Sequence, residues 1–127
     1  MPMSTRATRT LLKETILDEL QVLPELLRKA EARYYAARSE LEDKRLRLAE
    51  AEAAWSAGKA GEYEDETARF AALRAFTAPL RSDLRAARTE SDRLKTEVDF
   101  LRRRLANYRL MAGLLADGRG RGNCGDG

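Results

Sequence analysis

The sequence predicts an all-α protein, a long antiparallel two-helix coiled-coil hairpin that oligomerises into a helical bundle. Two rows of apolar residues, one in each half of the chain, repeat at alternating steps of three and four residues, which places each row on one face of a helix. Ala, Leu, Arg and Glu dominate the 127 residues and only three are proline, a composition typical of long helices. A short glycine-containing segment separates the two rows and predicts the turn of the hairpin.

The two apolar rows define the predicted core. Only Lys44, Thr77 and Ser91 interrupt them. Lys44 could set the register or the choice of partner, or its stem could lie along the row with the ammonium group in water. The first row consists of Ile16, Leu20, Leu23, Leu27, Ala30, Tyr34, Ala37, Leu41, Lys44, Leu48, Ala51 and Trp55. The second row consists of Phe70, Leu73, Thr77, Leu80, Leu84, Ala87, Ser91, Leu94, Val98, Leu101, Leu105, Tyr108, Ala112 and Leu115.

The first arm of the hairpin is expected over residues 16–57, after an N-terminal segment of residues 1–15 that is partly helical. Pro24 lies within this arm, and a proline inside a helix removes a hydrogen bond and costs about 3 kcal/mol. Since the apolar row continues through Pro24, the proline either kinks the arm or begins a second helix there.

The turn is expected at residues 58–61, where Gly58 and Gly61 could adopt the positive φ that ends a helix. A group of carboxylates follows directly, and carboxylates favour the positive end of a helix dipole. These features predict a second arm over residues 62–116, with a kink on its outer face at Pro79.

A turn at this place predicts the register of the two arms. Residues that face each other in an antiparallel hairpin have numbers with a constant sum, so that Leu48 is expected to face Phe70 and Ala37 to face Leu80. Most paired positions in this register are apolar. Two rows with a seven-residue repeat match in more than one register, however, so the match by itself is weak support.

Residues 117–127 are expected to form a disordered tail. Five of the eight glycines lie in the last ten residues, and the tail includes a Gly-Arg-Gly-Arg-Gly sequence. Glycine-arginine segments occur in flexible tails that bind nucleic acids, although an unconstrained chain end explains the composition equally well. Cys124, the only cysteine, leaves no internal disulfide to form.

Apolar residues outside the two rows predict a contact with further helices near the chain termini. An apolar face this wide is typical of bundles of three or four helices. Two explanations remain open. This face could be covered by the chain itself, through self-association or folding back of the N-terminal helix. Alternatively, a different protein could dock on it. The candidate contact residues are Leu11, Leu12, Leu17, Leu26, Phe100, Leu110, Met111 and Leu114. Near the turn half, Tyr35, Leu46 and Tyr63 are weaker candidates for a second protein contact.

The end of the hairpin that carries the termini is also basic, which raises the alternative of a nucleic-acid-binding accessory protein. Arginine contacts phosphate groups with two parallel hydrogen bonds. Arginine on the outside of a coiled coil, however, is more often solvated or paired with glutamate of the other helix. The candidate nucleic-acid contacts are Arg102, Arg103, Arg104, Arg109, Arg119 and Arg121.

The composition argues against an enzyme. The chain has no histidine, the commonest general base and metal ligand, and no glycine-rich phosphate loop follows a strand. We therefore expect no catalytic or metal site, no cofactor and no small-molecule substrate. No apolar run reaches the length of a membrane span or a signal peptide, so a cytoplasmic location without membrane contact is expected.

The chain resembles small coiled-coil hairpin proteins encoded by bacteriophages and mobile elements. The likeness rests on Leu23-Pro24-Glu25-Leu26, on Ala49-Glu50-Ala51-Glu52, and on Gly58-Lys59 leading to Glu66, Arg69 and Leu73. It implies a structural or accessory role and assigns no functional residues. Together with the patterns above, it predicts a non-enzymatic interaction or adaptor protein that forms a homo-oligomer, expected to be a dimer, and binds a further protein.

Overall fold

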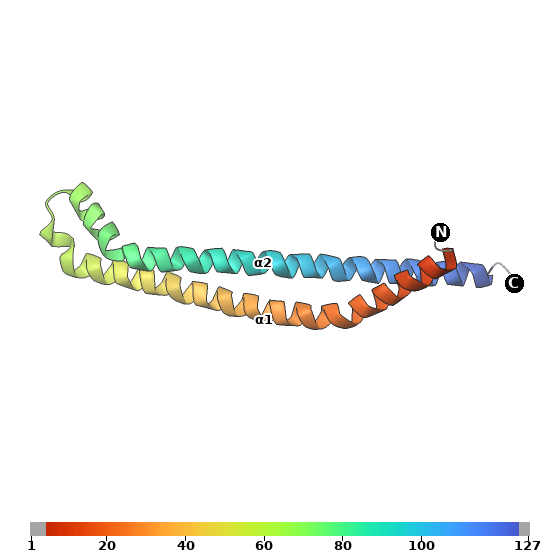
Figure 1. The fold of residues 1–127 in the computed structure, drawn as a ribbon. Coiled ribbons are helices and arrows are strands. Elements are labelled where there is room, and N and C mark those ends of the chain that lie inside the picture. Colours follow the sequence, from red (N-terminus) through yellow and green to blue (C-terminus); the bar gives the residue numbers. More distant parts are fainter. Residues whose placement is uncertain (1–4, 125–127) are drawn as a thin grey trace. The chain divides into compact units, whose positions relative to one another are not determined.

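The structure, a computed structural model, is an all-α helical hairpin, which confirms the predicted fold class. It describes the backbone of residues 5–124, and the side chains of this range except those of Ala60 and residues 118–124. Helix α1 covers Thr5–Lys59, a 3₁₀ turn η1 covers Ala60–Glu62, and helix α2 covers Glu66–Cys124. No strand occurs among the described residues. Figure 1 shows the two helices and the connection between them.

The chain divides into two compact units, each built from one stretch of α1 and one of α2. The terminal unit comprises Met1–Glu31 and Thr96–Gly127, whereas the turn unit comprises Ala32–Lys95. Within each unit the two helical stretches run in opposite directions, as their places in the hairpin require (Figure 1).

The core of each unit is formed by the two predicted apolar rows. Every residue of the first row is buried or half-buried, as is every residue of the second row except Phe70. Leu23 and Val98 of the terminal unit expose 0% and 2% of their surfaces. The alternating spacing was therefore sufficient to identify the buried faces, because it keeps successive apolar side chains on one side of each helix.

The connection between the helices lies later in the chain than residues 58–61. Neither Gly58 nor Gly61 adopts a positive φ, since the described part of the chain has no residue with this conformation. Instead, Asp65 caps α2: its side chain accepts a hydrogen bond from the backbone N–H of Thr67 at 3.1 Å, and its carbonyl accepts one from Arg69 at 3.0 Å. An aspartate cap satisfies N–H groups that lack a partner inside the helix. The second arm accordingly begins at Glu66 and not at residue 62.

The predicted register is wrong, because the helices reverse at this later point. Leu80 was expected to face Ala37. Instead it lines a small hollow together with Lys44, which lies seven residues after Ala37. In the same unit, Arg81 donates a hydrogen bond to Glu52 at 3.2 Å. Relative to the prediction, α2 is displaced along α1 toward the turn by at least about two helical turns. The rows still match, because a seven-residue repeat is satisfied in several registers.

Phe70 is exposed for the same reason. In the predicted register it faces Leu48, but it lies only about one turn after the cap of α2 and exposes 56% of its surface. Trp55 closes the core at this end instead. It is 6% exposed and stacks on Tyr63, with ring centroids 5.8 Å apart. Tyr63 is therefore half-buried against Trp55, while Tyr35 and Leu46 are exposed.

Both prolines lie inside continuous helices and are exposed. Of the two alternatives at Pro24, a helix that restarts there is wrong, because α1 continues from Thr5 through the proline. Helix formation is cooperative, so turns on both sides hold the backbone helical although one hydrogen bond is missing.

The predicted tail is helical over most of its length. Residues 117–124 belong to α2, so a disordered tail over residues 117–127 is wrong for this part, while residues 125–127 lie outside the described residues. Glycine weakens a helix by about 1 kcal/mol per residue but, unlike proline, keeps the backbone N–H that extends the helix from the preceding turn.

Candidate protein interface on the terminal unit

All eight predicted contact residues lie in the terminal unit and are exposed. Their exposed fractions range from 37% for Met111 to 63% for Leu110 and Leu114. Val22 of the same unit, which the sequence analysis did not single out, is 53% exposed. Among the described residues of the turn unit, the exposed large apolar side chains are Tyr35, Leu46, Phe70 and Phe76. The terminal unit thus carries most of the uncovered apolar surface.

An ion pair that joins the two helices marks one side of the terminal unit. Arg104 of α2 donates a hydrogen bond to Glu19 of α1, with 2.7 Å between Nη2 and Oε1. Residues three, four or seven positions from a helical residue lie on the same face as that residue. On α1, Leu12, Val22 and Leu26 stand at such positions relative to Glu19 and expose 41–53% of their surfaces.

Helix α2 repeats this arrangement around Arg104. Phe100 precedes Arg104 by four residues and Met111 follows it by seven, and both are exposed. The other outward positions at these spacings from Glu19 and Arg104 are occupied by Thr15, Asn107 and Glu97. The name apolar side refers below to the five exposed apolar residues around the ion pair: Leu12, Val22, Leu26, Phe100 and Met111.

A second ion pair marks the opposite side of the terminal unit, which is charged. Arg102 donates to Glu31 at 3.3 Å. Arg109 follows Arg102 by seven residues and Arg28 precedes Glu31 by three, so they lie on the same faces, and both are exposed. Arg28 also donates two hydrogen bonds to Glu25, at 2.7 and 3.1 Å. The two sides therefore differ in chemistry, one apolar around a neutral ion pair and the other rich in guanidinium groups.

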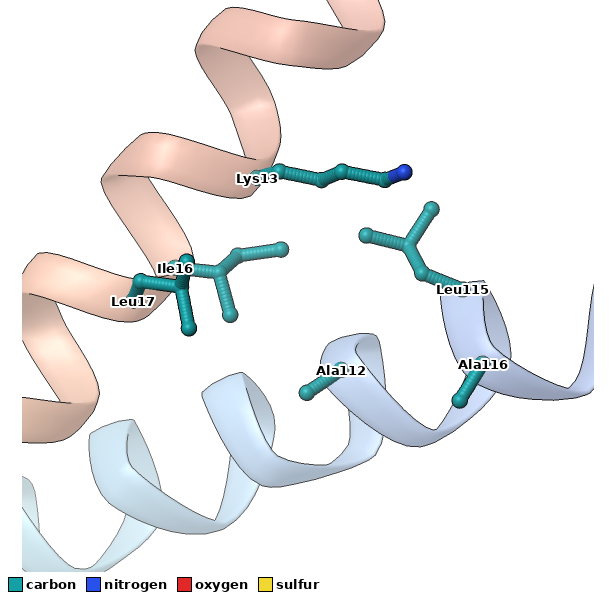
Figure 2. Close-up of a pocket in the computed structure, with 6 residues that line it drawn as sticks. All are labelled: Lys13, Ile16, Leu17, Ala112, Leu115 and Ala116. Atoms are coloured by element: carbon teal, nitrogen blue, oxygen red, sulfur yellow. The ribbon is translucent and has the colours of Figure 1, made fainter. Parts of the chain in front are cut away.

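A groove of about 300 Å³ lies between the two helices of the terminal unit, near the predicted contact residue Leu17. Figure 2 shows that three of its lining side chains come from α1 and three from α2, and that the Lys13 side chain extends across it toward Leu115. Except for Lys13 the lining is apolar. The lining residues are Lys13, Ile16, Leu17, Ala112, Leu115 and Ala116.

Among the predicted nucleic-acid contacts whose side chains the structure describes, three arginines have partners within the protein. Arg102 and Arg104 direct guanidinium nitrogens to Glu31 and Glu19, and Arg103 donates to the carbonyl of Asp99 at 3.4 Å. Arg109 is exposed on the charged side. The side chains of Arg119 and Arg121 lie outside the described residues. These contacts favour the interpretation of Arg102 and Arg104 as interhelical partners of glutamate.

Lys44, the charged residue of the first row, is half-buried, and its Nζ lies 3.4 Å from a carboxylate oxygen of Glu40. The stem thus runs along the row while the ammonium group reaches the surface, as in other lysines at the edge of a core. This geometry gives no indication of a partner-selecting role for Lys44.

The described residues contain no group of three or more acidic, cysteine or histidine side chains close enough to hold a metal ion. Within the same part of the chain, no helix is apolar enough over a sufficient length to cross a bilayer. The pKa values that depart from their ordinary range belong to exposed surface pairs: Arg28 lowers the pKa of Glu25, and Arg93 lowers that of Glu90. Neither pair lies in a pocket where a shifted pKa would serve proton transfer.

Val22, which the sequence patterns did not single out, lies outside both rows, between Gln21 and Leu23. Its position three residues after Glu19 indicates a place beside the ion pair only once Glu19 is known to pair with Arg104.

Comparison with known proteins adds no functional assignment, since no protein-family model, curated protein or solved structure shows significant similarity to this chain.

Proposed function

We propose that this chain is a non-enzymatic interaction protein, an adaptor or structural accessory factor that binds other helices through its terminal unit. The observation that carries the proposal is the apolar side. Five large apolar side chains from two helices surround a single ion pair and remain exposed. Exposed apolar surface of this extent on a helical protein commonly marks a protein interface.

The amount of uncovered surface supports the same function. The chain has a mass of 14.3 kDa and a solvent-accessible surface of 9782 Å². A stable complex of standard size covers about 800 Å² on each partner, so the chain has ample surface for one or more partners without loss of its own core.

The resemblance to hairpin proteins of bacteriophages and mobile elements agrees with an accessory role, and a phage or mobile-element origin is part of this proposal. A cytoplasmic location stays a prediction. The alternative of nucleic-acid binding gains no support from Arg102 and Arg104, because both pair with carboxylates.

The proposal can be tested by site-specific photo-crosslinking in cells that produce the full chain. A photoreactive amino acid in place of Val22 is expected to form covalent adducts with a protein, because Val22 lies on the apolar side. The same amino acid in place of Arg28, on the charged side, serves as the matched control and should give few adducts. Absence of any protein adduct at position 22, with the chain folded, would contradict the proposed function.

A further inference from the structure

We infer that the apolar side of the terminal unit is the interface between two copies of this chain, which pack as a four-helix bundle with a twofold axis parallel to the helices. The inference rests on the proposed interaction function and names its partner. It follows from the positions of the charged and apolar residues on the apolar side.

The charges on this side suit a second copy. A twofold interface brings a surface patch against itself, so a patch with a strong net charge would repel its own copy. At the centre of the apolar side one acid and one base, Glu19 and Arg104, lie 2.7 Å apart and neutralise each other. Their side chains remain 25% and 40% exposed, which leaves both able to accept a further partner.

The same two residues select the orientation of the second copy. If the twofold axis runs parallel to the helices, α1 of one copy lies on α2 of the other, and Glu19 faces Arg104 of the second copy. If the axis runs across the helices at the level of Glu19, α1 lies on α1, and Glu19 faces Glu19. Like charges across an interface oppose association, so the parallel axis is favoured. Both orientations make all neighbouring helices antiparallel, so the helix dipoles do not distinguish between them.

The apolar residues are placed consistently with this orientation. In an antiparallel pair, a step forward in α1 corresponds to a step backward in α2. Val22 follows Glu19 by about one turn and Phe100 precedes Arg104 by about one turn, so both are displaced from the ion pair in the same direction. Leu12 and Met111 stand about two turns away in the other direction. An axis parallel to the helices preserves these displacements, so Val22 of one copy and Phe100 of the other lie toward the same end of the interface, and Leu12 and Met111 lie toward the opposite end.

The residue types on the apolar side suit the core of an interface. The five residues expose between 37% and 55% of their surfaces and include an aromatic ring and a methionine, residue types enriched in interface cores. Association would turn the two-helix core of the terminal unit into a four-helix core, whose apolar rows are covered from two directions.

Sedimentation equilibrium of the full chain tests the inference. The wild type is expected to form a dimer, and Phe100→Asp should raise the dimer dissociation constant roughly tenfold or more. Leu110→Asp is the matched control, since Leu110 is exposed on the same helix but stands off the apolar side, and it should change the constant less than about threefold. Circular dichroism of each variant verifies that the helices remain folded.

Charge variants test the contact across the axis. Glu19→Arg and Arg104→Glu should each weaken the homodimer, whereas an equimolar mixture of the two should form heterodimers, because each acid then meets a base. A mixture that associates no better than the separate variants would show that the ion pair acts only within one chain and would overturn the inference. This result does not depend on the folding of Phe100→Asp.

Cysteine variants in a Cys124→Ser background test the orientation. A mixture of Glu19→Cys and Arg104→Cys should form an intermolecular disulfide more readily than Glu19→Cys alone, and the reverse order would overturn the parallel axis. A wild type that stays monomeric throughout would overturn the dimer, yet adducts of position 22 with another protein would then still support the proposed function. Absence of both dimer and adducts would overturn both.

Discussion

Thr77 illustrates how a polar residue is accommodated in an apolar row. Its hydroxyl donates to the carbonyl of Leu73 at 2.9 Å and accepts from Nε of Arg81 at 3.1 Å, and Arg81 continues to Glu52 on the other helix of the turn unit. Thr77 is fully buried, and a buried hydroxyl without partners would cost free energy. The interruption of the row is therefore satisfied by a short chain of hydrogen bonds between α1 and α2.

Surface carboxylates determine the acid sensitivity expected at the residue scale. The hydrogen bonds from Arg28 lower the pKa of Glu25 below its ordinary value of 4.5, and those from Arg93 do the same for Glu90. Since the folded pKa lies below the unfolded one, each pair stabilises the folded state above pH 4.5 and loses this contribution as the pH falls through the folded pKa.

We therefore expect the thermal midpoint to fall as the pH decreases from about 5 to about 3, and to fall less in the double variant Glu25→Gln/Glu90→Gln. The effect should be small and should shrink with added salt, because both pairs are exposed. Thermal unfolding followed by circular dichroism across this range measures it. An equal decrease in the wild type and the double variant would assign the acid sensitivity to other carboxylates.

At the scale of the helices, the ends of α2 are determined by capping and by propagation. Asp65 begins the helix by accepting the N–H of Thr67, although four acidic residues lie close together in this stretch of sequence. Only the residue whose side chain turns back to the first turn acts as the cap. The glycines further along do not end the helix, because none of the described residues adopts a positive φ.

Pro79 is the clearest opportunity to stabilise a helix. It is exposed inside α2, and its ring nitrogen cannot donate to the carbonyl of Ala75. Pro79→Ala should restore this bond and raise the free energy of unfolding by about 1–3 kcal/mol. Urea unfolding monitored at 222 nm provides the measurement, with the exposed Ala78→Ser as a control nearby. A loss of stability in Pro79→Ala would indicate that the helix pair packs only around the distortion that proline imposes.

At the scale of the whole molecule, stability depends on single narrow rows of apolar contacts. Each unit has only two helices to cover its core residues, so a buried leucine has few substitutes. Association of two copies would add apolar burial to the terminal unit and would make the observed stability depend on protein concentration.

Leu94→Asp should therefore destabilise the chain strongly. Leu94 is 4% exposed, and a carboxylate at such a site costs about 3 kcal/mol or more. Leu46→Asp, at a site that is 59% exposed, is the matched control and should change the free energy of unfolding by less than about 0.5 kcal/mol. Chemical unfolding of both variants compares them directly. A cooperative and fully helical Leu94→Asp variant with wild-type stability would refute the assignment of Leu94 to the core.

The fold class and the buried faces could be derived from the chain alone, because the repeat of three and four residues is a local property of each helix. The register, the partners of Arg102 and Arg104, and the existence of one apolar and one charged side could not. These depend on which residues of α1 and α2 lie side by side, and a seven-residue repeat permits several answers. The point of chain reversal, set by the Asp65 cap and the Trp55–Tyr63 stack, selects one of them, and only the folded structure shows where that point lies.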